Sequence, residues 1–293
     1  MLSTLCFNNY FGKLTPQVNN EYFVKELEVW RSATGNYNSA TQKRANVYIN
    51  LESRLPDETY GDDLRVRNGT SIDGQTIMYD LFEKLTEGVD YIYHESTGFI
   101  TFKTQIQRTD AIGVSYRTEG VTSDASDDKI YGEFERDIKD SVVILKLVKP
   151  ENLSPIFKQA WKLQLRNIYP LGGREINSEG FKLDMFYKIE GQELQNNYEG
   201  IKLLREFGLD KLDNSGQEGS DAEFDFRAGI TIIPETGEII FPTLKPFGRD
   251  LPESLKKYDI AYTSIYDTTK NFAQDDVSKN NRSKFVWCYF SQC

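Results

Sequence analysis

The feature that most constrains this chain is an alternation of apolar and charged residues over Phe181–Ile189. The odd positions are all apolar or aromatic, and the even positions are charged except Phe186. A period of two predicts a half-buried strand, because successive side chains point to opposite faces. Trp161–Arg166 repeats the pattern, and turn-forming residues lie between the two runs: Pro170, Gly172, Gly173 and Gly180. We therefore predict an antiparallel pair joined by a turn-rich loop.

Further strands are predicted from shorter apolar faces. These faces are Leu27 and Val29 beside Trp30, the group Val47, Ile49 and Leu51, and the group Ile112, Val114 and Tyr116. Ser141–Leu147 is apolar almost throughout, which predicts a strand covered on both sides. The chain also has 18 Phe and 17 Tyr against 3 Met, a bias toward residues that pack on sheets. The expected fold is mainly β with minor helices (α+β), built from antiparallel, hairpin-rich sheets.

Three helices are expected among the strands. Thr76–Leu85 places Ile77, Leu81 and Leu85 on one stripe, and Gly88 can close the helix. Ile201–Phe207 is a shorter candidate that ends before Gly208. The third runs from Leu251 to about Ala273, with Pro252 near its start.

One internal repeat is visible in the sequence. Glu95–Thr104 aligns with Pro234–Thr243, and each copy has a Thr-Gly pair at the tip of a predicted hairpin. Glycine is expected there because the turn needs a positive φ. The repeat is either a chance recurrence of Thr-Gly hairpins or a duplicated structural module.

The expected organisation has two β-rich modules. The first covers residues 1–122 and contains one helix, and residues 123–140 form an acidic loop and a connecting strand. The second module covers residues 141–275 and has short helices, and residues 276–293 form an atypical tail. We place the boundary between the modules near Ser123–Asp128, because this stretch of small and acidic residues is typical of a surface loop.

Charge and hydropathy exclude several classes of protein. The 293 residues carry a net charge of −10, so a phosphate backbone is repelled and nucleic acid is not an expected partner. Residues 1–14 lack the basic segment of a signal peptide, and no apolar run reaches the ~18 residues of a membrane-spanning helix. An export signal and any membrane-embedded part are therefore expected outside this chain. The cysteines lie near the two ends and give no disulfide or metal-ligand spacing: Cys6, Cys288 and Cys293.

Catalytic motifs are not found, and the chain is predicted not to be an enzyme. His94 is the only histidine, which argues against a histidine-rich metal site and against Ser-His or Cys-His catalysis. We interpret His94 as a surface residue beside the first hairpin turn. Leu171–Arg174 is too short a glycine signal to hold phosphate and is interpreted as a turn.

An acidic stretch is the one candidate for a cation site, and calcium is the one cofactor considered. Oxygen ligands spaced through a loop rich in Gly and Ser suit Ca²⁺, although the spacing differs from an EF-hand. The alternative is a solvated acidic loop without metal. The candidate ligands are Asp210, Asp213, Asn214, Asp221 and Asp225, with Glu223 nearby.

Aromatic residues alternate on the first hairpin: Tyr91, Tyr93, Phe99 and Phe102. Such rings can stack on sugars, which gives the alternative function of a cell-surface adhesin or carbohydrate-binding β module. Packing in the core explains the same residues with fewer assumptions.

A series of landmarks follows the strand predicted at Ser141–Leu147. In order, the landmarks are Ile144–Leu147, Leu153–Pro155, Trp161, Arg166–Gly173, Phe181–Asp184, Gly208–Asp213, Glu223–Phe226, Gly237–Pro242, Pro246–Gly248 and Tyr266–Lys270. The upstream landmarks are Lys25–Trp30, Val47–Leu51, Asp90–Tyr91 and Gly98–Ile100. Together they resemble a block in the SprA/Sov family, the outer-membrane translocon of type IX secretion and gliding motility in Bacteroidetes. Residues 1–9 and 282–293 depart from the family pattern, which indicates a truncated or frame-disturbed gene fragment.

The resemblance implies a giant β-barrel of the cell outer membrane that passes folded cargo to the cell surface. It also implies a lateral-gate partner, a periplasmic plug and secreted cargo proteins as partners. The predicted strands alternate with charged faces and are interrupted by helices, so we expect an extramembrane segment, periplasmic or extracellular, rather than barrel wall. Membrane association would come from parts of the protein outside this chain. The resemblance carries over no catalytic residue.

Overall fold

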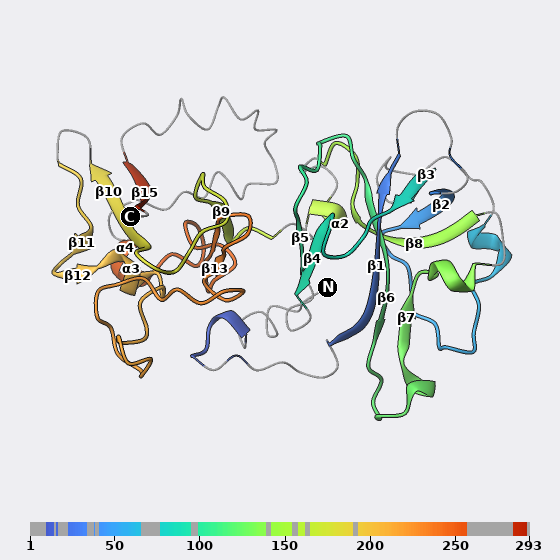
Figure 1. The fold of residues 1–293 in the computed structure, drawn as a ribbon, viewed down its shortest axis with the longest axis horizontal. Coiled ribbons are helices and arrows are strands. Elements are labelled where there is room, and N and C mark those ends of the chain that lie inside the picture. Colours follow the sequence, from blue (N-terminus) through green and yellow to red (C-terminus); the bar gives the residue numbers. More distant parts are fainter. Residues whose placement is uncertain are drawn as a thin grey trace. The chain divides into compact units, whose positions relative to one another are not determined.

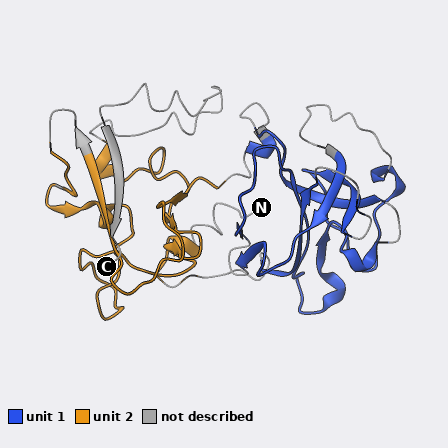
Figure 2. Ribbon diagram, turned by 45° about the horizontal axis from the view of Figure 1, so that its top comes forward, with its two compact units in different colours: residues 1–2, 18–164 blue, residues 3–17, 165–293 orange. Residues whose placement is uncertain are grey.

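The computed structural model divides into two compact units, which are coloured separately in Figure 2. Unit 1 contains residues 1–2 and 18–164, and unit 2 contains residues 3–17 and 165–293. The structure describes residues 10–14, 16, 23–33, 38, 41–65, 77–94, 99–138, 142–153, 158–161, 165–189, 193–256 and 284–291.

Short strands dominate both units, as Figure 1 shows. The strands of unit 1 are β1 (Val24–Ser32), β2 (Gln42–Tyr48), β3 (Ile77–Lys84), β4 (Tyr91–His94), β5 (Phe99–Phe102), β6 (Ile112–Thr118), β7 (Lys129–Tyr131) and β8 (Val142–Lys149). The strands of unit 2 are β9 (Ile168–Pro170), β10 (Lys182–Ile189), β11 (Asn197–Tyr198), β12 (Ile201–Lys202), β13 (Ile232–Ile233), β14 (Glu238–Ile240) and β15 (Lys284–Ser291). The α-helices are α2 (Lys158–Trp161), α3 (Leu203–Glu206) and α4 (Glu253–Lys256). The predicted fold class, mainly β with minor helices, is confirmed.

Unit 1 is built on a sheet that closes on itself. The sheet runs in the order β1-β3-β2-β8-β6-β7, and an additional pairing of β1 with β6 joins its two sides. The pairings within this sheet are antiparallel except β2 with β8, which are parallel. Closure leaves the central strands with a partner on each side, which removes the exposed edges that invite aggregation.

The closed sheet encloses an apolar core. Alternate residues of its strands meet inside, and the largest are Trp30, Phe82, Leu145 and Leu147. Gly113 lies opposite Trp30 in the β1–β6 register. A Cβ atom at Gly113 would lie 3.1 Å from side-chain atoms of Leu145 and Val47, so glycine leaves the room that this packing needs.

The β4–β5 hairpin packs on the outer face of β1 and β6. Val29, Ile112 and Val114 point to this face, opposite to the neighbouring positions that fill the interior. The hairpin covers them with buried Tyr91, and Tyr93, Ile100 and Phe102 pack on the same cluster. Unit 1 therefore has one core inside the closed sheet and a second beneath the hairpin.

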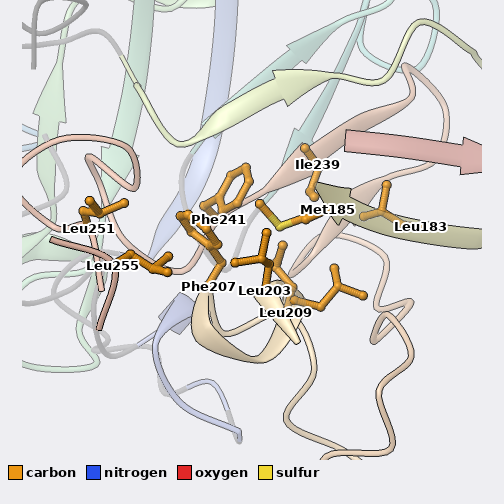
Figure 3. Packing of buried hydrophobic residues seen from close by; sticks show 10 residues of the cluster. Leu183, Met185, Leu203, Phe207, Leu209, Ile239, Phe241, Leu251 and Leu255 are labelled. Atoms are coloured by element: carbon orange, nitrogen blue, oxygen red, sulfur yellow. The ribbon is translucent and has the colours of Figure 1, made fainter. Parts of the chain in front are cut away.

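Unit 2 has smaller sheets around its own core. β9 and β13 flank β14 in a three-stranded antiparallel sheet, β10 pairs with β15, and β11 pairs with β12. Figure 3 shows how side chains from α3, β10, β14 and α4 meet in one cluster. Its buried residues are Leu183, Met185, Leu203, Leu204, Phe207, Leu209, Ile239, Phe241, Leu251 and Leu255.

The helix predicted at Thr76–Leu85 is wrong, because Ile77–Lys84 forms strand β3. The apolar stripe fits a helix, yet β1 and β2 both pair with this segment through backbone hydrogen bonds. Pairing on two sides outweighs a weak local preference. The second predicted helix is shorter than Ile201–Phe207 and covers Leu203–Glu206. Glu253–Lys256 is the described part of the third, since residues 257–283 lie outside the described range.

The strand predicted over Phe181–Ile189 is confirmed as β10, with Leu183 and Met185 buried, but its predicted partner is wrong. β10 pairs with β15 in antiparallel register along its whole length, and Met185 lies opposite Cys288. The tail that was expected to be atypical thus supplies the neighbouring strand.

Trp161–Arg166 does not form the predicted partner strand in its described residues. Trp161 ends helix α2, and Leu165 and Arg166 have no regular structure. Residues 162–164 lie outside the described range.

The two units divide at residue 164, and not at the expected boundary in 123–140. Residues 129–131 form β7, and Val142–Lys149 forms β8, and both belong to the closed sheet of unit 1. The pairing of β8 with β2 and β6 keeps this segment in unit 1.

Both predicted Thr-Gly hairpins are present, in matching register. His94 pairs with Phe99 in β4–β5, and Ile233 pairs with Glu238 in β13–β14. Gly237 has a φ of +68°, as the turn prediction requires. Residues 97 and 98 of the first copy lie outside the described range.

Candidate functional site

Charged side chains follow the apolar core along the inward-facing positions of the closed sheet. On β1, Trp30 is followed at the same face by Glu28 and Glu26, and on β6 Gly113 is followed by Ser115 and Arg117. The register places Glu28 opposite Ser115 and Glu26 opposite Arg117. One end of the sheet interior is therefore polar, and we call these residues the polar end.

Ion pairs connect the polar end to its surroundings. Lys84 Nζ lies 2.8 Å from Glu28 Oε1 and 2.9 Å from Glu135 Oε2. The second oxygen of Glu28 accepts the backbone N–H of Glu135 at 2.9 Å. Arg136 binds the carboxylate of Glu26 in a bidentate manner, through both terminal guanidinium nitrogens. This hydrogen bonding holds the pKa of the Glu26 carboxyl below its usual value. These contacts tie β1 to β3 and to the segment after β7.

A second group of charges surrounds the buried carboxylate of Asp128. Lys25 Nζ lies 3.0 Å from Asp128 Oδ1 and 3.4 Å from Glu119 Oε1. Arg117 Nε lies 3.7 Å from Asp128 Oδ2, and the backbone N–H of Gly120 donates to Asp128 at 3.3 Å. Two cations and an N–H thus compensate the burial of this acid.

A largely buried ion pair joins Arg65 to Glu133. The side chains are 16% and 8% exposed, and both terminal guanidinium nitrogens contact the carboxylate. Arg65 Nη1 also donates to the carbonyl of Val142 at 2.9 Å, while Glu133 accepts the N–H of Ile144 at 3.0 Å. The pair therefore attaches the loop before β3 to β8.

Tyr60 joins the loop after β2 to strand β7. Its hydroxyl donates to the carbonyl of Glu52 at 3.0 Å and accepts the backbone N–H of Gly132 at 3.0 Å. Burial raises the pKa of Tyr60 to about 12.

We expect Tyr60→Phe to reduce the free energy of unfolding by about 1–2 kcal/mol at pH 7, because a hydroxyl with two partners is lost. The raised pKa means that ionisation costs the folded state more than the unfolded state. The contribution of Tyr60 is complete below its unfolded pKa of about 10 and is lost as pH rises toward 12. The stability gap between wild type and variant, measured by urea unfolding from pH 8 to 12, should therefore close. A gap that stays constant or widens contradicts the prediction.

The acidic stretch of unit 2 uses its carboxylates inside its own loop. Asp225 accepts the N–H groups of Lys211 and Leu212 at 2.7 and 3.2 Å. Asp213 accepts from Ser215 and Gln217, Asp210 accepts from Ser220 and Asp221, and Asp221 accepts from Glu223. Asn214 is exposed in the turn. Burial raises the pKa of Asp225, and the neighbouring charge of Asp210 adds to this.

Of the calcium ligands predicted from sequence, Asp210 and Asp225 lie close enough for their charges to interact. Across the described ranges, no three His, Cys, Asp or Glu side chains are grouped closely enough to hold a metal ion. The four aspartates of the loop accept bonds from N–H or hydroxyl donors of the loop itself, and the calcium site stays a prediction.

The aromatic residues of the first hairpin lie in the core. Tyr91 and Phe99 are buried, and Tyr93 and Phe102 pack against the cluster beneath the hairpin. This agrees with the core interpretation and leaves Tyr91 and Phe99 without an open face for a sugar. His94 is half-buried beside the turn, where its ring stacks on Phe99 and its Nε2 lies 3.0 Å from Thr101 Oγ1.

Sequence reasoning missed the ion pairs that organise unit 1. The alternation of Glu26 and Glu28 with Leu27 and Val29 is a usable signal, since it marks a strand with one charged face. The pairing of Arg65 with Glu133 spans 68 residues of sequence, and no local pattern indicates it.

Comparison with protein-family models and with curated proteins finds no match for this chain. Within the described part of the chain, no helix has the length and apolarity needed to cross a bilayer.

Proposed function

We propose that this chain is a structural, extramembrane part of an outer-membrane protein-translocation pore of the SprA/Sov type. In this proposal it acts in type IX secretion and gliding motility and performs no bond chemistry. Its partners are the lateral-gate subunit, the periplasmic plug and the cargo proteins that pass through the pore.

The observation that carries the proposal is the ordered series of sequence landmarks from Lys25–Trp30 to Tyr266–Lys270. Many landmarks in one order are more specific than any single motif. The family resemblance supplies the activity, and the geometry is consistent with a supporting role.

Several landmark residues occupy positions with a clear structural purpose. Gly208 and Gly237 have φ values of +72° and +68°, and Leu209 and Phe241 are fully buried. Glycines with a positive φ set the path of the backbone, and buried apolar residues form the core. They support a role in which the landmarks preserve shape.

The ion pairs of unit 1 support the same role. The closed sheet and the contacts of Arg65, Glu28 and Asp128 connect segments that are distant in sequence. A module held in this way is suited to support or cap a passage, while the energy for transport comes from elsewhere.

The test uses an antibody raised against the purified chain and a cell in which the coding segment is deleted in frame. We expect the antibody to detect a protein much larger than 33.8 kDa in the outer-membrane fraction, and the deletion to abolish secretion of a type IX reporter cargo. Deletion of a neighbouring gene of unrelated function is the control. Detection of a free cytoplasmic protein, or normal secretion after deletion, overturns the proposal.

A further inference from the structure

The two Thr-Gly hairpins share more than their register. In unit 1, Thr86 N donates to Asp90 Oδ2, Asp90 N donates to Thr86 O, and Gly88 N donates to Tyr91 O, each at 2.8 Å. These bonds form a closed turn directly before β4. Lys103 N then donates to Asp90 O at 2.9 Å, which ties the turn to the returning strand.

Unit 2 repeats this set of bonds before β13. Arg227 N donates to Thr231 Oγ1 and Thr231 N donates to Arg227 O, both at 2.9 Å, and Gly229 N donates to Ile232 O at 2.8 Å. Ile240 N donates to Thr231 O at 2.8 Å. The glycines match as well, with φ values of +78° at Gly88 and +75° at Gly229. The units therefore contain one module twice, with four residues in β4 and two in β13.

The copies differ at the outer edge of the returning strand. In unit 2, β9 pairs with β14, with Tyr169 opposite Ile239. Leu171 N donates to Gly237 O, and Phe241 N donates to Asn167 O, both at 2.8 Å. The odd-numbered residues of β14 therefore face β9, because the bonding direction alternates along a strand.

In unit 1, the equivalent edge belongs to β5. Lys103 N faces β4, so Phe99 and Thr101 face β4 as well, and Ile100 and Phe102 direct their backbone groups to the other side. Among the described residues, β4 is the only strand that pairs with β5. The edge that carries β9 in one copy therefore lacks a described strand in the other.

We propose that the outer edge of β5, at Ile100–Phe102, is an acceptor site for an extended strand of another polypeptide that pairs antiparallel to β5. The seated β9 of unit 2 indicates both the direction and the register of the bound strand. This inference is independent of the proposed translocon function.

The packing also indicates the chemistry of the bound strand. Tyr169 lies opposite Ile239 and packs edge-on against Phe241, with ring centroids 5.6 Å apart. Ile100 and Phe102 pack on the cluster beneath the first hairpin. A residue opposite Ile100 would lie over the same cluster, so the bound strand should carry a large apolar side chain there.

The test uses the full chain and a synthetic peptide of residues 165–172, the segment that contains β9. With saturating peptide, amide hydrogen exchange at Ile100 and Phe102 should slow by about tenfold or more, while Thr101, which faces β4, stays protected throughout. The control peptide carries an N-methyl group at Tyr169, which removes the central donor, and should give no protection. Because this control changes only the peptide, its result does not depend on whether a protein variant folds.

A protein variant tests the same edge from the other side. Ile100→Pro removes an N–H that the hairpin does not use, together with part of the side chain that packs on the cluster, so peptide binding should be lost and the thermal midpoint should fall moderately. Ile100→Ala is the matched control, because it removes a similar amount of packing but keeps the N–H, and it should still bind the peptide. Slow exchange at Ile100 and Phe102 without peptide would mean that the chain itself covers the edge. That result, or unchanged exchange with peptide, overturns the proposal.

Discussion

Gly237→Ala should lower the free energy of unfolding by about 2–5 kcal/mol. Gly237 has a φ of +68°, a conformation that costs an L-residue about 1–2 kcal/mol. A Cβ atom there would also lie 1.9 Å from the carbonyl oxygen of Gly173, and relieving such overpacking costs about 1–3 kcal/mol. The hairpin and the loop after β9 must move apart to admit the methyl group. Urea unfolding of the full chain, followed by tryptophan fluorescence and circular dichroism, measures the loss.

Gly172→Ala provides the control within the same loop region. Gly172 also has a positive φ, of +89°, but a Cβ atom would meet nothing within 4 Å. This variant should lose only the conformational part, about 1–2 kcal/mol. If both variants lose the same free energy of unfolding, the close approach of Gly173 to Gly237 does not contribute to the loss.

Arg65→Ala should lower the free energy of unfolding by about 3–5 kcal/mol, because it leaves Glu133 as an unpaired buried charge. The two side chains are 16% and 8% exposed, so water cannot replace the guanidinium fully. The double variant Arg65→Met with Glu133→Leu should recover most of the loss, since it removes both charges. Chemical unfolding of the three proteins at pH 7 gives the values.

Arg136→Ala is the matched comparison, because Arg136 also contacts a glutamate with both terminal guanidinium nitrogens. Its side chain is 56% exposed, so the loss should stay below about 1 kcal/mol. If Arg65→Ala costs no more than Arg136→Ala, burial does not set the strength of the pair at Glu133.

The strands with clear alternation or a continuous apolar run could be predicted from sequence. Val142–Lys149 and Lys182–Ile189 are examples, since burial of one or both faces leaves a period of two or an unbroken run. Their partners could not be predicted. β10 pairs with β15, about a hundred residues later, and no local pattern specifies that contact.

Ile77–Lys84 shows where pattern reasoning fails. Ile77, Leu81 and Leu85 share a helical stripe in the sequence, but Phe82 points into the closed sheet and the backbone pairs with two strands. The local pattern favours a helix, and long-range pairing selects the strand.

The candidate cation site was also only partly predictable from sequence. The position of the acidic loop could be predicted, because Asp and Gly cluster there, but the direction of each carboxylate could not. Asp210 and Asp225 turn toward N–H and hydroxyl donors of their own loop. Side-chain direction depends on the folded loop and cannot be deduced from composition.

The parallel pairing of β2 with β8 has a consequence for synthesis of the protein. Strand β2 lies early in the chain, yet its neighbour β8 is the last strand of the closed sheet in sequence. The edge of β2 that pairs with β8 therefore stays open until the chain as far as Lys149 is available for folding. A partly folded unit 1 would be most exposed to aggregation in this interval.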